Sequence, residues 1–157
     1  MKNPPVVEKL QVRYQDLDPY GHVNNAFHMA DFESVRLAYM ESIAGHLELG
    51  PLEAGDLPGV RYVIAEATVR YKAPIKLGDT LHGAASIRTV GNRSFVMDYE
   101  LRAGKSYENG VVAAEGTSAQ VFYDPEADEV RSRPDWFLSA VAVIEGRPEE
   151  SFPPEGR

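Results

Sequence analysis

A segment in the first third of the chain carries an uninterrupted helical pattern. After Ala26 no glycine or proline occurs until Gly45, and alanine, leucine, methionine and glutamate are frequent. These residues favour helix, so we predict a long helix over 26–45. On a helical wheel its apolar residues spread over almost the whole circumference: Phe27, Ala30, Phe32, Val35, Leu37, Ala38, Tyr39, Met40 and Ile43. A helix of this kind is typically buried, so we expect the rest of the domain to enclose it.

Apolar and polar residues alternate in most of the remaining chain, which indicates strands. A first strand is predicted over 6–14, before Asp16 and Asp18. A loop rich in glycine and proline occupies 50–59, and four further strands are predicted at 60–73, 81–89, 95–103 and 111–123. Short turn signals separate these four strands, which favours an antiparallel meander over a parallel sheet. Several strand positions are alanine or glycine, which leaves room for a helix to lie close to the sheet.

The C-terminal region is predicted to hold a short helix and a tail. Pro134 is a suitable first helical residue, and an amphipathic stripe follows it: Trp136, Phe137, Ala140, Val141 and Ile144. The last residues, 146–157, contain three prolines and three glutamates and little that could be buried. We therefore expect one domain over 1–145 and a disordered acidic tail over 146–157.

Composition excludes several classes of function. The 16 lysines and arginines against 24 aspartates and glutamates give a net charge of −8, which argues against nucleic acid or an anionic membrane as partner. The chain has no cysteine, so disulfides, thiolate metal sites and a cysteine nucleophile are excluded. Only four histidines are present, without clustered ligand spacing, and we expect no metal site. No apolar run has the length of a signal peptide or a membrane span, so we expect a cytoplasmic protein.

Unusual chemistry is concentrated between residues 14 and 40. Asp16 and Asp18 lie close to a Pro-Tyr-Gly turn, to His22, and to Asn24 and Asn25, which can cap the long helix. A strand end, a turn and a helix N-terminus therefore meet here. Free backbone N–H groups and the positive end of the helix dipole suit a reaction that develops negative charge.

The sequence of this junction resembles a known family. The run D-x-D-P-x-G-H-V-N-N, followed on the helix by F-E-S-V-R, is similar to acyl-CoA thioesterases of the 4-hydroxybenzoyl-CoA thioesterase-like family. Supporting phrases are Tyr71-Lys72-Ala73-Pro74, Gly78-Asp79 and Gly91-Asn92-Arg93-Ser94-Phe95, and the match spans 8–123. The resemblance implies the α+β hotdog fold, in which an antiparallel five-stranded sheet wraps a long central helix.

The resemblance also implies roles for individual residues. Asp18 stands where this family carries its catalytic carboxylate, which either attacks the thioester carbonyl or activates water. The backbone N–H near Asn25 would polarise the thioester oxygen. His22 is a further catalytic candidate, although it could equally support the loop or contact substrate. The remaining loop candidates for substrate binding are Tyr20, Gly21 and Asn24.

Each candidate also has a structural interpretation. Asp18 taken alone would be a turn residue, and we assign Asp16 to that role. Glu33 and Arg36 lie three residues apart on the helix and are expected to pair with each other. Some hotdog thioesterases use a helical carboxylate, so Glu33 is the reserve catalytic candidate. Glu66 is a weaker candidate, expected to face solvent.

Coenzyme A carries phosphates, so an acidic protein needs local basic residues to bind it. Arg93 is the first candidate, and Arg88 and Lys72 follow. The sequence does not specify which acyl group is bound, because Phe27, Phe32 and Tyr62 could line an aryl pocket, line a fatty-acyl channel, or fill the core. The resemblance implies a homodimer or homotetramer with the pocket between subunits, and no cofactor besides the coenzyme A of the substrate.

Two other functions are compatible with the same residues. A hotdog hydratase or dehydratase would need a histidine and a carboxylate at the acyl carbons beside the carbonyl, such as His22 and Asp18. A non-catalytic acyl-CoA-binding protein would tolerate the loss of Asp18. Release of free thiol distinguishes hydrolysis from both alternatives.

Overall fold

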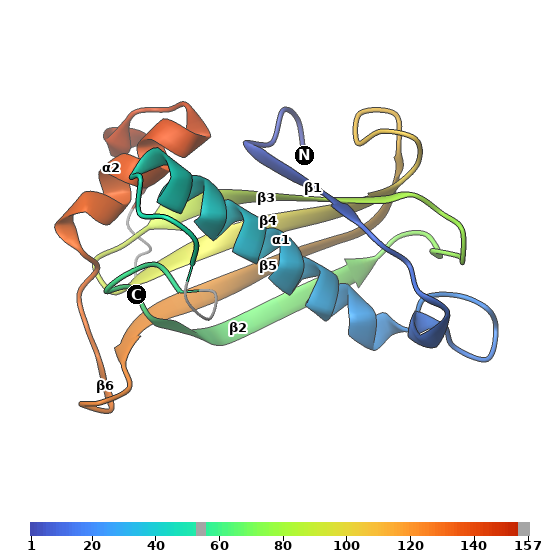
Figure 1. The fold of residues 1–157 in the computed structure, drawn as a ribbon, viewed down its shortest axis with the longest axis horizontal. Helices are drawn as coiled ribbons and strands as arrows, with labels where there is room; N and C mark the ends of the chain where they lie inside the picture. Colours follow the sequence, from blue (N-terminus) through green and yellow to red (C-terminus); the bar gives the residue numbers. More distant parts are fainter. Residues whose placement is uncertain (53–55, 154–157) are drawn as a thin grey trace.

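The computed structural model describes residues 1–52 and 56–153. One long helix lies across one face of a curved antiparallel sheet, and a shorter helix lies at one end (Figure 1). The main elements are β1 (Val6–Leu10), α1 (Asn25–His46), β2 (Tyr62–Tyr71), β3 (Leu81–Val90), β4 (Ser94–Ala103), β5 (Val111–Asp124), β6 (Glu129–Val130) and α2 (Asp135–Glu145). Two 3-10 turns occupy Tyr14–Asp16 and Glu149–Ser151.

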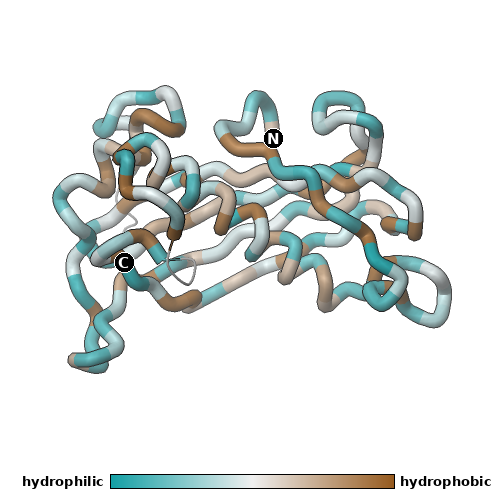
Figure 2. The backbone as a smooth tube through the Cα atoms, viewed as in Figure 1, coloured by the Kyte–Doolittle hydropathy of each residue, from teal (hydrophilic) through white to brown (hydrophobic). Residues whose placement is uncertain are grey.

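The sheet has the strand order β1-β3-β4-β5-β2, and every pair is antiparallel. This confirms the predicted five-stranded sheet around a long helix, the hotdog fold. The short strand β6 pairs with the end of β5 in a mostly hydrophilic hairpin that projects from the sheet (Figure 2). The first strand ends at Leu10 rather than at residue 14, because Tyr14–Asp16 turns toward the loop that precedes α1.

Helix α1 packs unusually close to the sheet. Its buried apolar residues are Phe32, Val35, Tyr39, Met40, Ile43 and Ala44. Gly83 and Gly116 lie beneath it, and a Cβ atom at either position would come within 2.3 Å of a helix side chain, Val35 or Phe32 respectively. The glycines therefore set the distance between helix and sheet. The predicted burial on almost all sides is wrong for Ala30 and Leu37, which are exposed because the sheet covers only one side of α1.

Helix α2 and the residues after it close one end of the core. Phe137 of α2 packs against Phe95 and Phe122 of the sheet, with ring centroids 5.2 Å from each. The sequence led us to expect disorder from residue 146 onward. In the structure, an Arg147 Nη2 donates to the carbonyl of Ile87 at 2.6 Å, and the guanidinium lies 3.7 Å from the centre of the Phe152 ring.

Phe152 is buried, so the described part of the tail, 146–153, packs on the domain. A cation–π contact provides this packing, which the composition of the segment does not reveal. The other residues of the expected tail, 154–157, lie outside the described residues. Within the described ranges, no helix is both long and apolar enough to cross a membrane.

Candidate active site

The loop before α1 is organised by the side chain of Asp18. Its Oδ1 accepts hydrogen bonds from the backbone N–H groups of Tyr20 at 2.8 Å and His22 at 3.1 Å. The Asp18 carbonyl accepts from the N–H of Gly21 at 3.0 Å, and Gly21 has φ +78°, which favours glycine. Within the described residues Oδ2 accepts no hydrogen bond, so the carboxylate keeps one oxygen for another partner.

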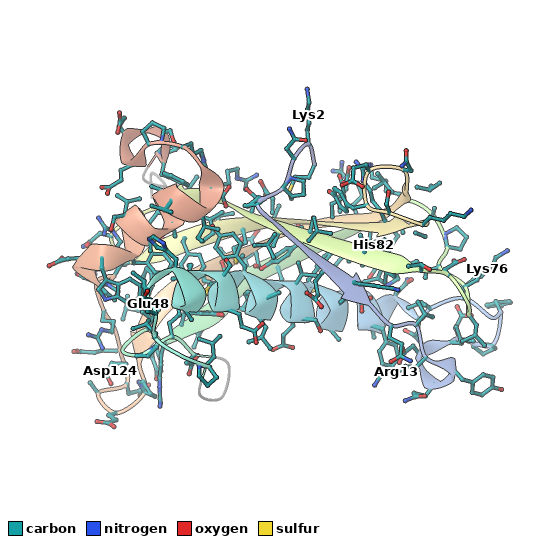
Figure 3. All side chains as sticks on the ribbon, turned by 45° about the horizontal axis from the view of Figure 1, so that its top comes forward. Lys2, Arg13, Glu48, Lys76, His82 and Asp124 are labelled. Atoms are coloured by element: carbon teal, nitrogen blue, oxygen red, sulfur yellow. The ribbon has the colours of Figure 1, made fainter. Side chains whose placement is uncertain are left out.

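Asp16 also holds this loop in place, through hydrogen bonds to the residues on either side of it. Its carboxylate accepts from the guanidinium and backbone N–H of Arg13 at 2.8–3.1 Å, and its carbonyl accepts from the N–H of Asn24 at 2.8 Å. The hydrogen bonds from Arg13 hold the pKa of Asp16 below its ordinary value. Arg13 and Lys76 lie at the end of the molecule where α1 begins (Figure 3). Asp16 thus has the structural role expected of it.

The N-terminus of α1 opens beside Asp18. Asn24 is the N-cap, as predicted, and its Oδ1 accepts from the N–H of Ala26 at 3.0 Å. The N–H of Asn25 forms no hydrogen bond with the residues that the structure describes. An unsatisfied amide at the positive end of a helix is suited to bind an oxyanion.

These groups line one cleft of about 250 Å³ between the loop, α1 and the end of β2. Its lining consists of Asp18, His22, Val23, Asn25, His28, Tyr71, Lys72, Ala73, Pro74 and Ile75. The residue with a free carboxylate oxygen, Asp18, and the residue with the unbonded helix amide, Asn25, therefore line the same small cleft. Such an arrangement can attack an acyl carbon, or activate water for that attack, and stabilise the charge that develops on its oxygen.

Sequence comparison assigns the chain to a family. Residues 12–141 match the family model of the thioesterase-like superfamily. The chain belongs to this superfamily. Membership confirms the resemblance found in the sequence and identifies the protein as a thioester hydrolase.

Solved structures of thioesterases are similar to this one. A thioesterase from Thermus thermophilus, complexed with coenzyme A and Zn, is 31% identical, covers 94% of this chain and 100% of its own, and has a TM-score of 0.75. A predicted thioesterase from Bacillus stearothermophilus is 23% identical over 96% of this chain and 98% of its own, with a TM-score of 0.69. The DHNA-CoA thioesterase from Staphylococcus aureus is 18% identical over 89% of this chain and 90% of its own, with a TM-score of 0.70. The last two show the fold alone, and no curated relative matches by sequence.

Two residues of the cleft in this thioesterase-like protein, His28 and Tyr71, were not predicted as site residues from the sequence. His28 is buried, and its ring packs edge-on against Tyr71 with 5.0 Å between centroids. The Tyr71 hydroxyl donates to the carbonyl of Asn25 at 3.2 Å. Helical spacing could have indicated His28, because it lies three residues after Asn25 and so shares its face. Tyr71 lies in a strand whose neighbours only the fold reveals.

The basic candidates are not all brought to the cleft. Lys72 lines it and pairs with Glu115 at 3.0 Å. Arg88 pairs with Asp98 at 3.2 Å on the sheet, and Arg93 lies exposed in the turn between β3 and β4. This turn is at the far end of the sheet, because each strand reverses direction relative to its neighbour. Within one chain, Arg93 therefore lies far from the Asp18 cleft.

The reserve carboxylates also lie outside the cleft. Glu33 pairs with the buried Arg36 at 3.6 Å, as the spacing predicted, and its side chain is exposed. Glu66 is exposed on β2, also as expected. Among residues 1–52 and 56–153, no three histidine, aspartate or glutamate side chains lie close enough together to hold a metal ion.

Asp31 gives a prediction for pH dependence. Burial, and secondarily the negative charge of Asp16, raises the pKa of Asp31 from 3.8 to about 6. The folded state therefore binds this proton more tightly than the unfolded state does. The resulting stabilisation is fully present at a pH below the unfolded-state pKa, and it is lost as the pH rises through about 6. Asp31→Asn should therefore raise the free energy of unfolding at pH 8 by about 1 kcal/mol, a value that already allows for solvent screening. At pH 4.5 the gain should be much smaller. Urea denaturation at both pH values measures the difference, and an equal effect at both would contradict the assignment.

Proposed function

We propose that this protein hydrolyses an acyl-CoA thioester to a free acid and coenzyme A, with Asp18 as nucleophile or general base. The observation that carries this proposal is that one cleft is lined by both Asp18 and Asn25, and that the N–H of Asn25 forms no hydrogen bond with the described residues. The reactive carbonyl would lie between them, with its oxygen toward the helix N-terminus. Oxyanion stabilisation of this kind is commonly among the largest contributions to catalysis.

Two routes use the same geometry. In the first, an Asp18 oxygen attacks the acyl carbon, the C–S bond breaks, and water hydrolyses the resulting anhydride. In the second, Asp18 takes a proton from a water molecule while the oxygen of that water attacks the acyl carbon and the C–S bond breaks. Coenzyme A leaves as a thiolate in either route, and solvent protonates it.

A second cavity could hold the acyl group of the substrate. It measures about 180 Å³ and lies between α1 and the sheet, next to the cleft along both α1 and β2. Its lining includes Met29, Phe32 and Ile64, together with polar groups at Arg36 and Tyr99. Phe32 and Tyr99, which both line this space, are stacked on each other with centroids 4.9 Å apart. The acyl chain would extend from Asn25 into this cavity.

We propose a homodimer that completes the site. The edge strand β2 pairs only with β5 in the described chain and exposes Val63, Ile64 and Tyr71. An exposed apolar edge favours pairing with a second copy. Antiparallel pairing of two β2 strands reverses their direction, so Arg93 of the partner subunit would lie toward the Asp18 end of the first. This arrangement would add a cation for the coenzyme A phosphates beside Lys72, which lines the cleft but pairs with Glu115.

The nucleotide assignment gives a further prediction. Arg93→Ala should raise KM for acyl-CoA about tenfold and leave KM for the corresponding acyl-pantetheine thioester unchanged, because one charge-assisted phosphate contact is lost. Arg131→Ala, an exposed arginine of the β6 hairpin, is the matched control. Equal effects of Arg93→Ala on both thioesters would remove Arg93 from the nucleotide site.

The activity itself is tested with a panel of acyl-CoA thioesters. Aliphatic, aryl and hydroxylated acyl-CoAs are incubated with the protein, and free thiol is titrated while double-bond absorbance is recorded. Thiol release supports hydrolysis. A change in double-bond absorbance without thiol would instead indicate a hydratase, and binding without either change would indicate an acyl-CoA-binding protein.

A further inference from the structure

His28 has a contact pattern that packing alone does not explain. Only 3% of its surface is exposed, yet it lines the cleft together with Asp18 and Asn25. Its Nδ1 is buried and forms no hydrogen bond of normal geometry with the described residues. A buried polar atom without a partner costs free energy and so requires an explanation, of which a catalytic role is one.

The surroundings of His28 fix the orientation of its ring. Tyr71 packs against one side, and its hydroxyl is held by the carbonyl of Asn25. The carbonyls of Asn24 and Asn25 lie near the imidazole and favour a proton on the ring, although neither forms a hydrogen bond of normal geometry with it. These carbonyls belong to the residues three and four positions earlier in the chain, so they favour a proton on Nδ1. The other nitrogen, Nε2, then carries the free lone pair.

The surroundings also favour the neutral imidazole. Burial lowers the pKa of His28, and the carbonyls of Asn24 and Asn25 oppose this only in part. The positive end of the α1 dipole adds to the cost of a protonated ring. The other titratable side chains that line the cleft are Asp18, His22, Tyr71 and Lys72. None of the ion pairs formed among the described residues involves His28, so no carboxylate holds it in the charged form.

We propose that Nε2 of His28 is the general base that activates water to hydrolyse an acyl intermediate on Asp18. This inference rests on the proposed thioesterase function and selects the nucleophilic route. Asp18 attacks the thioester carbonyl and coenzyme A leaves, giving a mixed anhydride. Water then attacks the acyl carbon of the anhydride while His28 accepts its proton. The C–O bond to Asp18 breaks, the acid departs, and the imidazolium returns its proton to solvent.

The test is rapid mixing of His28→Gln with a thioester that the wild type hydrolyses. We expect a burst of about one thiol per subunit, because Asp18 can still attack, followed by steady turnover slowed about a hundredfold. The fall of wild-type kcat toward low pH should be absent from this variant. His46→Gln, an exposed histidine at the other end of α1, is the matched control and should behave as the wild type.

Several outcomes would overturn the inference. Wild-type steady turnover in His28→Gln would show that another base activates the water. A slow variant with no burst and an unchanged pH profile would show that His28 only supports the fold. His28→Phe keeps the aromatic contact with Tyr71 and provides the same readouts if His28→Gln is unstable. A wild-type protein that releases no thiol from any acyl-CoA would contradict the proposed function itself.

Discussion

Replacement of Gly116 by alanine should lower the free energy of unfolding by about 3 kcal/mol, near the upper end of overpacking costs. The new Cβ would lie 2.3 Å from Cε2 of Phe32 and 2.5 Å from the backbone carbonyl oxygen of Thr68. The carbonyl belongs to β2, which is fixed in register with β5, so the clash must displace α1 or the strand pair. Thermal and urea denaturation measure the loss.

Gly45→Ala is the matched control for this prediction. Gly45 lies in the last turn of α1, and a Cβ there meets no heavy atom within 4 Å. Alanine is the better helix former, so this substitution should stabilise the protein by up to about 1 kcal/mol. Unchanged stability of Gly116→Ala would contradict the close packing of α1 on the sheet.

The fold could be predicted largely because each element has a clear period. The alternation of apolar and polar residues in 81–89 and 95–103 predicts strands β3 and β4 to within one residue at each end. The absence of glycine and proline between Ala26 and Gly45 predicts α1. Features that depend on distant contacts could not be predicted. Phe152 is buried in the hydrophobic core and contacts the guanidinium of Arg147, and no local pattern specifies these contacts. The exposure of Leu37 depends on which side of α1 the sheet covers.

In the candidate site, too, local contacts could be predicted from the sequence and distant contacts could not. Asp18 and Asn25 lie within one short loop and cap, so local turn and capping rules bring them together. Tyr71 enters through strand pairing, which no local pattern specifies. For Arg93 the local resemblance of a short turn predicted a position near the nucleotide. The strand directions instead place Arg93 at the end of the sheet that lies away from the Asp18 cleft of the same subunit.

Asp18→Asn should lower kcat by about a thousandfold while the fold is retained. Asparagine keeps an oxygen that can accept from the N–H groups of Tyr20 and His22, so the loop should hold its conformation. The negative charge is lost, and with it both the nucleophile and the alternative general base. Thermal unfolding and gel filtration should show no change in stability or assembly.

Asp79→Asn provides the control, because Asp79 also caps a turn, with Oδ2 accepting from the N–H of Lys76 at 2.8 Å outside the cleft. The most direct test measures thiol release by the wild type, Asp18→Asn and Asp79→Asn side by side, on the best acyl-CoA. We predict that the wild type and Asp79→Asn release thiol at similar rates and that Asp18→Asn releases almost none. Equal rates for Asp18→Asn and the wild type would contradict the assignment of the active site to this cleft.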